Sequence, residues 1–246
     1  MKSFTLPENP ATVIASDVHI RTPQDDRYMM LCELVEQAAR VGAKSFVLNG
    51  DIFDFFFGWS SYFRNRYGRL LDGLDQLAGH GATVWFVEGN HEFGLTALSR
   101  HYRFDVVPSE GRVMLLPKSQ RLLIAHGDLL SDDFWYKLFR MVMRSTMVNL
   151  LAAAFPQALL DRLTLWLAST SRKKDKYRDL NHEKIKTGAA QKLKAADADV
   201  IVFGHFHHPY DEKLEGRGRL LSVTSWDEPS CIVVTQDGEI LRMKPH

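Results

Sequence analysis

The chain has few cysteines, little net charge and no long apolar run, and each of these shortages excludes a class of protein. Among its 246 residues are two cysteines, Cys32 and Cys231, which lie far apart and lack the Cys-x-x-Cys spacing of a zinc ribbon. They predict core thiols in a reducing compartment rather than a disulfide framework. The formal net charge of +1 gives no overall field that would favour nucleic acid, so we expect no nucleic-acid partner.

The sequence also lacks the marks of a membrane-spanning or exported protein. The longest uncharged stretch of its apolar middle, Ser145 to Leu160, includes Asn149 and Pro156 and is shorter than the roughly 20 residues of a spanning helix. The segment from Met1 to Pro10 has no basic part followed by an apolar part, so it does not resemble a secretory signal. We therefore expect a cytoplasmic protein.

In the first hundred residues, apolar strands alternate with segments of helical periodicity. Strands are expected at 12–15, 45–48 and 83–87, and helices at about 26–41, 62–78 and 95–101. Strands that alternate with helices of this length predict a parallel sheet with crossover helices, and therefore an α/β fold.

The second half changes period and carries a segment unlike the rest. A hairpin is expected at 113–116 and 121–125, a helix at 181–195, and strands at 200–203 and near Leu220, Ile232 and Ile240. Between them, residues 134–171 have a helical apolar pattern broken at Pro156, and a basic run follows at 172–178. Because this part interrupts a strand series, we expect one domain over 1–246 with an inserted helical lobe over 134–178.

Five of the apolar runs end in side chains that commonly bind metal ions. These residues are Asp17 and His19, Asp51, Asn90, His126, and His205 and His207. In open α/β sheets, binding sites form at the carboxyl ends of the strands, so we expect the five ends to share one site. The other histidines lack this context and are expected to be ordinary or peripheral: His80, His101, His182, His208 and His246.

The ligand types indicate the chemistry of this site. Mixed imidazole and carboxylate ligands suit manganese, iron, zinc or cobalt better than calcium. Seven ligands are too many for one ion and suit two ions with a shared bridge. Two such ions clamp a phosphoryl group and lower the pKa of a bound water, which favours hydrolysis at phosphorus. His91 would stabilise the transferred group or protonate the leaving oxygen.

The motifs Asp-x-His, Gly-Asp-x-x-Asp, Gly-Asn-His-Glu, His-Gly-Asp and Gly-His-Phe-His span the chain from Asp17 to His207. In this order they resemble the motif series of the calcineurin-like metallophosphoesterases. The resemblance implies a four-layer αββα sandwich with two mixed sheets face to face. It implies catalytic roles for Asp51, Asn90 and His91 and two divalent ions, with manganese the first choice. One ion would take Asp17, His19 and His207, the other would take Asn90, His126 and His205, and Asp51 would bridge them.

A narrower resemblance depends on the expected lobe. His126-Gly127-Asp128, then Asp132-Asp133 and Tyr136 in an apolar helical segment, are similar to the UDP-2,3-diacylglucosamine pyrophosphatases of lipid A synthesis, and Trp226 fits them too. This resemblance implies cleavage of a UDP-linked diacylated sugar at the inner membrane face, releasing UMP and the acylated sugar 1-phosphate. The lobe would receive the acyl chains. The substrate-binding residues would be Tyr136, Arg172, Lys173 and Lys176. That family typically has Arg where this chain has His91.

The residue pattern alone leaves open the role of the apolar stripe, the role of the basic run and the exact activity. The apolar stripe of Leu159, Leu163, Trp166 and Leu167 fits packing against the main domain as well as it fits acyl binding. The basic run fits a solvated helix end as well as a contact with pyrophosphate or with anionic headgroups. The activity could also be that of a phosphodiesterase or phosphomonoesterase acting on small nucleotides or phosphoproteins. A non-enzymatic scaffold is disfavoured because the ligand set is complete.

Overall fold

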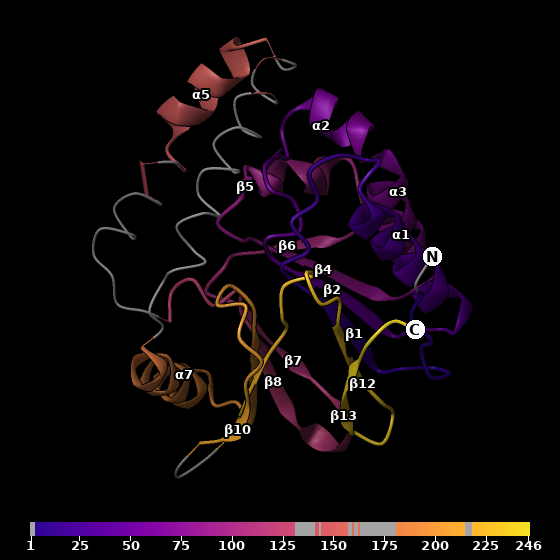
Figure 1. Ribbon diagram of the computed structural model, residues 1–246, viewed down its shortest axis with the longest axis vertical. Helices are drawn as coiled ribbons and strands as arrows, with labels where there is room; N and C mark the ends of the chain where they lie inside the picture. The colour runs from indigo at the N-terminus through magenta and orange to yellow at the C-terminus, as the bar shows by residue number, and fades with distance from the viewer. Residues whose placement is uncertain are drawn as a thin grey trace.

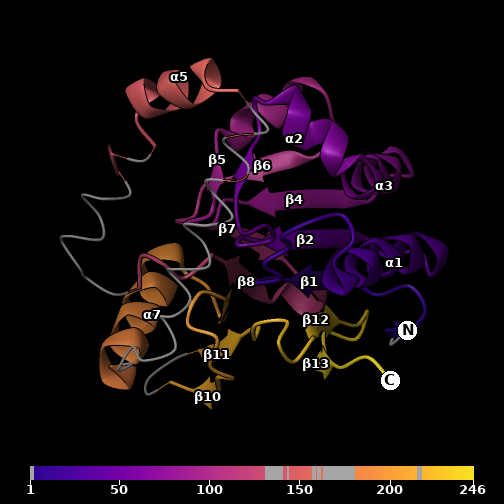
Figure 2. The ribbon, with the colours of Figure 1, turned by 45° about the horizontal axis from the view of Figure 1, so that its top comes forward.

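The computed structural model describes residues 3–130, 141–142, 144–156, 159, 162, 181–214 and 218–246. In these parts of the chain, two large β-sheets pack face to face, with helices on both outer sides (Figures 1 and 2). The predicted four-layer α/β sandwich is therefore confirmed. Most of the lobe expected over 134–178, including its basic run, lies outside the described residues.

The first sheet contains the parallel core predicted from the alternating pattern. Its strand order is β13-β12-β1-β2-β4-β6. The parallel members are β1 (Thr12–Ala15), β2 (Ser45–Asn49), β4 (Thr83–Val87) and β6 (Asp105–Val107). The antiparallel members are β12 (Cys231–Val234) and β13 (Ile240–Met243). The crossover helices are α1 (Asp26–Arg40) and α3 (Gly68–Gly79), which pack against each other.

The second sheet has the order β10-β11-β9-β8-β7. Its strands are β7 (Arg112–Leu115), β8 (Arg121–Ile124), β9 (Val200–Phe203), β10 (Asp211–Lys213) and β11 (Arg219–Ser222). Strands β7 and β8 form the predicted antiparallel hairpin, with a 3-10 turn η2 (Pro117–Ser119) between them. Helix α7 (His182–Ala196) lies over the outer face, as Figure 2 shows.

The central strands are continuous apolar runs in the sequence because both faces of each strand are buried. In β9, Val200 and Val202 point into the core between the sheets, whereas Ile201 and Phe203 pack with residues of α7 such as Ala189. Successive side chains of a strand face opposite sides, so a strand covered on both sides must be apolar at every position.

Two local predictions need correction. The helix expected over 62–78 is two helices, α2 (Ser61–Arg66) and α3, which are separated at Tyr67. The Tyr67 hydroxyl donates to the carbonyl oxygen of Arg21 at 3.1 Å, and its ring lies 4.5 Å from that of Phe53. These long-range contacts hold Tyr67 outside helical geometry, and periodicity does not detect them. The short helix expected at 95–101 is a 3-10 helix, η1 (Leu95–Arg100).

A small sheet was not foreseen. Strands β3 (Phe56–Phe57) and β5 (Glu92–Phe93) pair in parallel. Each has two residues, which is too short for a period of two to be visible in the sequence. The pairing joins the segment after Asp51 to the segment that contains Asn90 and His91.

The described residues of the expected lobe include helix α5 (Thr146–Ala154), which ends before Pro156 as the sequence predicts. Asn149 and Ala152 are half-buried, and Ala152 packs against the main core. Leu150 and Leu151, by contrast, are exposed. The helix therefore presents apolar side chains to its outer side, which is the reverse of an ordinary surface helix.

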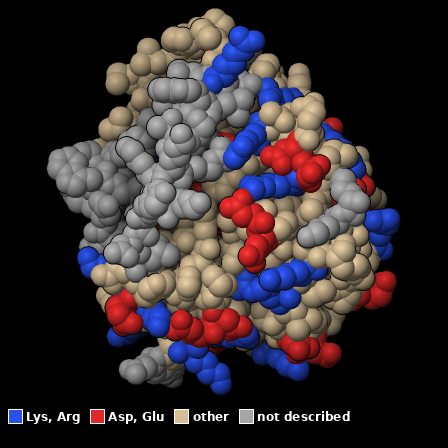
Figure 3. All heavy atoms as spheres, in the orientation of Figure 1, with Lys and Arg blue, Asp and Glu red and all other residues tan. Residues whose placement is uncertain are grey.

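The distribution of charge on the surface agrees with the nearly equal numbers of acidic and basic residues. Acidic and basic side chains are interspersed over much of the face in Figure 3, and the surface at α5, at the top of that view, is largely uncharged.

Both cysteines are buried free thiols, as predicted. Among the described segments, we find no helix with the length and apolar character needed to cross a bilayer.

Candidate metal centre

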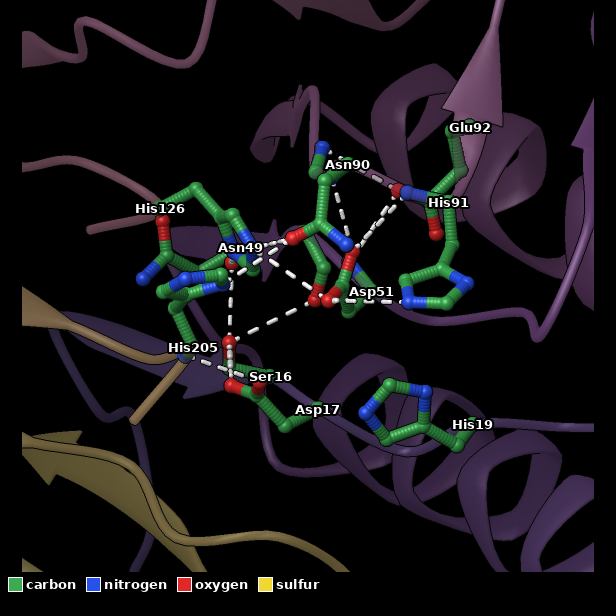
Figure 4. Close-up of polar contacts among 12 residues, drawn as sticks. Ser16, Asp17, His19, Asn49, Asp51, Asn90, His91, Glu92, His126 and His205 are labelled. Carbon is green, nitrogen blue, oxygen red and sulfur yellow. Dashed lines mark hydrogen bonds and ion pairs between the residues drawn. The ribbon is translucent and has the colours of Figure 1, made fainter. Parts of the chain in front are cut away.

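The seven candidate ligands follow five strands that belong to both sheets. Three of these strands, β1, β2 and β4, come from the first sheet, and β8 and β9 come from the second. Their carboxyl ends meet at one edge of the sandwich, where the side chains converge. Figure 4 shows Asp51 in the middle of this cluster, between His126 and His91. The strand-end pattern therefore does bring these residues to one place.

One group of ligand atoms comes from Asp17, His19 and His207, and all of them lie within 4.8 Å of one another. The Nε2 atom of His207 is 3.2 Å from Asp17 Oδ1 and 3.2 Å from His19 Nε2. Two imidazole nitrogens and a carboxylate oxygen that face one point make a donor set suited to a divalent cation.

A second group comes from Asp51, His126 and His205, again within 4.8 Å. Asn90 belongs with it, because its Oδ1 atom lies 3.1 Å from His126 Nε2 and 3.0 Å from His205 Nδ1. Asp51 also forms a group with His19 and His91. Its carboxylate therefore lies between the two groups.

The backbone at these ligands adopts a costly conformation. Nine non-glycine residues of the described chain have a positive φ, and five of them are candidate ligands: Asp17, His19, Asp51, His205 and His207. Such angles cost free energy and persist where the surrounding structure enforces them, often at functional sites. Here the strained residues coincide with candidate ligands at the strand ends.

Two motif glycines are required by close approach. A Cβ atom at Gly89 would collide with the backbone nitrogen and the carboxylate of Asp51, and one at Gly204 would collide with the carboxylate of Asp17. A glycine at each position lets a ligand carboxylate lie directly against the neighbouring backbone.

Glu92 is a site residue to which the sequence analysis gave no role. Its buried carboxylate accepts four backbone hydrogen bonds, from the N–H groups of Asp51 (3.0 Å), Ile52 (2.6 Å), Phe53 (3.1 Å) and Gly89 (3.0 Å). It therefore joins the loop after β2 to the loop after β4. The available signal was an acidic residue directly after His91, at the end of the Gly-Asn-His-Glu motif.

Carbonyl oxygens orient two of the imidazoles. His126 Nδ1 lies 3.0 Å from the carbonyl oxygen of Asn49, and His91 Nδ1 lies 2.8 Å from that of Asp54. A carbonyl accepts only from N–H, so in each ring Nδ1 carries a proton, and Nε2 is the nitrogen that gains or releases the second proton. In both rings Nε2 faces Asp51 Oδ2, at 3.4 Å from His126 and 3.9 Å from His91.

The charges within the cluster shift its pKa values in opposite directions. Burial lowers the pKa of His126, but the surrounding carboxylates, Asp51 foremost, together outweigh burial and bring this pKa to about 10. Burial raises the pKa of Asp51, but His126 and His91 outweigh it and hold this pKa well below its usual value. Burial and the charge of His126 together lower the pKa of His205 to about 4.

These shifts predict proton release on metal binding. Without metal at pH 7, His126 holds a proton because its pKa of about 10 lies above the pH, whereas His205 is neutral. A cation needs the Nε2 lone pair of His126, so loading should release about one proton per chain at this histidine. Metal affinity should fall as the pH is lowered. Titration calorimetry in buffers of different ionisation enthalpy measures the proton count, and a heat independent of the buffer would contradict the prediction.

Comparison with known proteins identifies the family. The family model described as calcineurin-like phosphoesterase matches residues 11–209 of the chain. The chain belongs to this family. It is accordingly a metal-dependent phosphoesterase, and the two ligand groups fit divalent ions because their nitrogen and oxygen donors converge.

Pairwise sequence identity to individual relatives is low. The UDP-2,3-diacylglucosamine hydrolase of Aeromonas hydrophila is 24% identical over 242 residues, which cover 96% of this chain and 98% of the relative. The protein of the same name from Blochmanniella pennsylvanica is 27% identical over 204 residues, covering 81% and 80%. Among solved structures, an archaeal phosphodiesterase is similar, with a TM-score of 0.47 and 12% identity over 94% of this chain and 97% of its own.

The remaining candidates are the expected substrate contacts, Trp226 and the histidines expected to be ordinary or peripheral. The expected substrate contacts lie outside the described residues: Tyr136, Arg172, Lys173 and Lys176. Trp226 lies beside the centre, where its backbone N–H donates to the carbonyl oxygen of Asp17 at 3.1 Å. Of the histidines expected to be ordinary or peripheral, His182 and His208 pack against each other, with ring centroids 4.9 Å apart.

Proposed function

We propose that this phosphoesterase cleaves the pyrophosphate of UDP-2,3-diacylglucosamine, releasing UMP and 2,3-diacylglucosamine 1-phosphate for lipid A synthesis. The observation that carries the proposal is an exposed apolar helix, α5, beside the candidate metal centre. The names of the relatives support the same substrate, since the Aeromonas protein aligns along almost its whole length.

Exposed apolar side chains concentrate in one segment of the described chain. Eight large hydrophobic residues are exposed, and all but Leu115 lie between 141 and 159: Met141, Val142, Met147, Leu150, Leu151, Phe155 and Leu159. A concentration of this kind marks a lipid, membrane or partner site. A small polar substrate gives no reason for it.

Aromatic rings lead from the centre to this helix. Phe55 lies 6.1 Å from the ring of His91 and 5.5 Å from that of Phe93, and Phe57 contacts both Phe93 (5.5 Å) and Trp59 (5.1 Å). Trp59 Nε1 in turn donates to Asn149 of α5 at 2.9 Å. Phe57 and Phe93 are buried, so in this row the half-buried Phe55 and Trp59 are the rings that would offer apolar surface to an acyl group.

The residues of the centre take the following roles in the proposal. Asp17, His19 and His207 would hold one divalent ion, Asn90, His126 and His205 would hold the other, and Asp51 would lie between them. Such ions, when bound, would supply Lewis-acid polarisation of the phosphoryl oxygens and would lower the pKa of the attacking water. His91, fixed through Nδ1 by the Asp54 carbonyl, presents Nε2 toward the substrate phosphate, where it stabilises charge or protonates the leaving oxygen. Manganese is our first choice of metal.

We propose likewise that residues 1–246 form one domain and that 134–178 form a lobe over the centre. Tyr136, Arg172, Lys173 and Lys176 would contact the pyrophosphate or anionic headgroups. The outer face of α5 would contact the cytoplasmic side of the inner membrane, where the lipid substrate resides. Sedimentation with liposomes tests that contact, and absence of binding at low salt would contradict it.

The direct test is release of UMP by the manganese-loaded protein. UDP-2,3-diacylglucosamine, unacylated UDP-N-acetylglucosamine and an aryl phosphodiester are assayed in parallel. We expect the acylated substrate to be turned over at least about a hundredfold more efficiently than the unacylated one, because apolar contacts contribute to its binding. Turnover of the aryl diester alone would reject the lipid substrate and leave the phosphoesterase activity intact.

A variant of α5 tests the apolar face. In the double variant Leu150→Glu/Leu151→Glu, kcat/KM for the acylated substrate should fall about a hundredfold, since each apolar contact contributes roughly 1.5 kcal/mol. The aryl diester rate should not change. Leu115→Glu is the matched control, because Leu115 is also an exposed leucine but lies in β7. Equal losses on both substrates, or a similar loss in the control, would contradict a role for this face in acyl binding.

A further inference from the structure

An arginine just before α5 contacts the loop that carries two candidate catalytic residues. Arg144 donates through Nη2 to the carbonyl oxygen of Gly89 at 2.6 Å and pairs through Nη1 with the carboxylate of Glu88 at 2.6 Å. The side chains of Arg144 and Glu88 are 22% and 14% exposed, so the ion pair is largely removed from solvent. Charge-assisted hydrogen bonds of this length are stronger than neutral ones.

The peptide between Gly89 and Asn90 connects this arginine to the metal centre. The carbonyl side of the peptide accepts from Arg144, and its N–H side, the backbone nitrogen of Asn90, donates to Asp51 Oδ1 at 2.9 Å. The next backbone nitrogen, that of His91, donates to the same oxygen at 3.1 Å. A cation at the carbonyl polarises the peptide and strengthens donation from its N–H, because hydrogen bonds in a chain reinforce one another.

The other end of the loop is also tied to α5. The ring of Trp59 packs so closely on Gly94 that an added Cβ would lie 2.6 Å from Trp59 Cδ1. Trp59 Nε1 donates to Asn149 Oδ1, and Asn149 Nδ2 donates to the carbonyl oxygen of Ser145 at 3.1 Å. The segment 144–149 therefore holds the loop 88–94 at both of its ends.

We propose that Arg144 is a positioning residue, which fixes the Gly89–Asn90 peptide so that Asn90 and His91 are aligned with Asp51. Through it, the position of α5 is coupled to the geometry of the reacting centre. This inference rests on the ligand assignment of the proposed function, but it does not depend on the acylated substrate.

The test compares Arg144→Gln and Arg144→Lys on a small aryl phosphodiester with manganese. Arg144→Gln should lower kcat between about tenfold and a hundredfold and change KM less than about threefold, because displacement of aligned groups reduces the rate of the bound complex. Arg144→Lys should recover part of kcat, since an ammonium group can still donate to the Gly89 carbonyl. The visible spectrum of cobalt-substituted protein should shift in Arg144→Gln, which reports ligand geometry independently of turnover.

Two further variants separate positioning from loss of an ion pair. Glu88→Gln keeps the Arg144 contact with Gly89, so kcat and the cobalt spectrum should stay near wild type. Arg103→Gln removes a pair with Asp75 of similar length, 2.7 Å, far from the loop, and should change neither. Thermal unfolding confirms that each variant is folded.

Three results would overturn the inference. The first is a wild-type kcat and cobalt spectrum in Arg144→Gln. The second is an Arg144→Lys variant as impaired as Arg144→Gln. The third is loss of turnover of only the acylated substrate, which would make Arg144 a substrate contact. Failure of the phosphoesterase assignment is distinguishable, because wild-type protein would then not hydrolyse the aryl diester.

Discussion

Replacement of Asp51 by asparagine is expected to reduce phosphodiester turnover by about a thousandfold, equivalent to about 4 kcal/mol in the barrier. Asp51 Oδ1 accepts from the backbone nitrogens of Asn90 and His91, while Oδ2 faces the imidazoles of His126 and His91. Asparagine keeps the size of the side chain but removes the charge that lies between the two ligand groups. If Asp51 is the bridge that we propose, its loss should also weaken metal binding.

The measurement is kcat/KM on an aryl phosphodiester together with the metal content of the purified protein. Asp75→Asn is a matched control, because Asp75 pairs with Arg103 at the surface and is distant from the ligands. We expect the control to keep its metal content and at least half of its turnover. An Asp51→Asn variant with more than about a tenth of wild-type activity would contradict the assignment of Asp51 as the bridge.

The parts of the fold that could be predicted are those with a local signal. Strands β1, β2, β4, β8 and β9 appear as apolar runs in the sequence because both of their faces are covered. The polar residue at the end of each run has no local structural purpose. For that reason the convergence of Asp17, Asp51, Asn90, His126 and His205 could be expected before the structure was known.

The features that could not be predicted depend on contacts between distant segments. The break at Tyr67 depends on a hydrogen bond to Arg21, and the contact of Arg144 with Gly89 crosses 55 positions of the chain. Neither residue stands out in its own neighbourhood, since an arginine in an apolar helical segment looks like an ordinary solvated charge. Sequence reasoning therefore predicted which candidate ligands converge but not the side chains that hold their loops.

Removal of the Glu92 carboxylate should destabilise the protein more than removal of any single apolar contact on α5. In Glu92→Ala, the four backbone N–H groups that this carboxylate accepts from lose their acceptor inside the protein. An unsatisfied buried donor costs about 1 to 3 kcal/mol, and partial relaxation makes the costs less than additive. We expect the free energy of unfolding to fall by about 3 to 5 kcal/mol, as when one partner of a buried charged network is removed.

Urea unfolding of the metal-free protein measures this loss without a contribution from metal affinity. Glu36→Ala is the control, because Glu36 is half-exposed and its pair with Arg69 at 2.8 Å lies at the surface, where such pairs contribute about 0 to 1 kcal/mol. Glu92→Gln adds a graded case, since its amide keeps one acceptor oxygen but places a donor against N–H groups. The fall in the free energy of unfolding should be smaller for Glu92→Gln than for Glu92→Ala, but greater than zero. Equal stability of Glu92→Ala and Glu36→Ala would show that the loops after β2 and β4 are held together by other contacts.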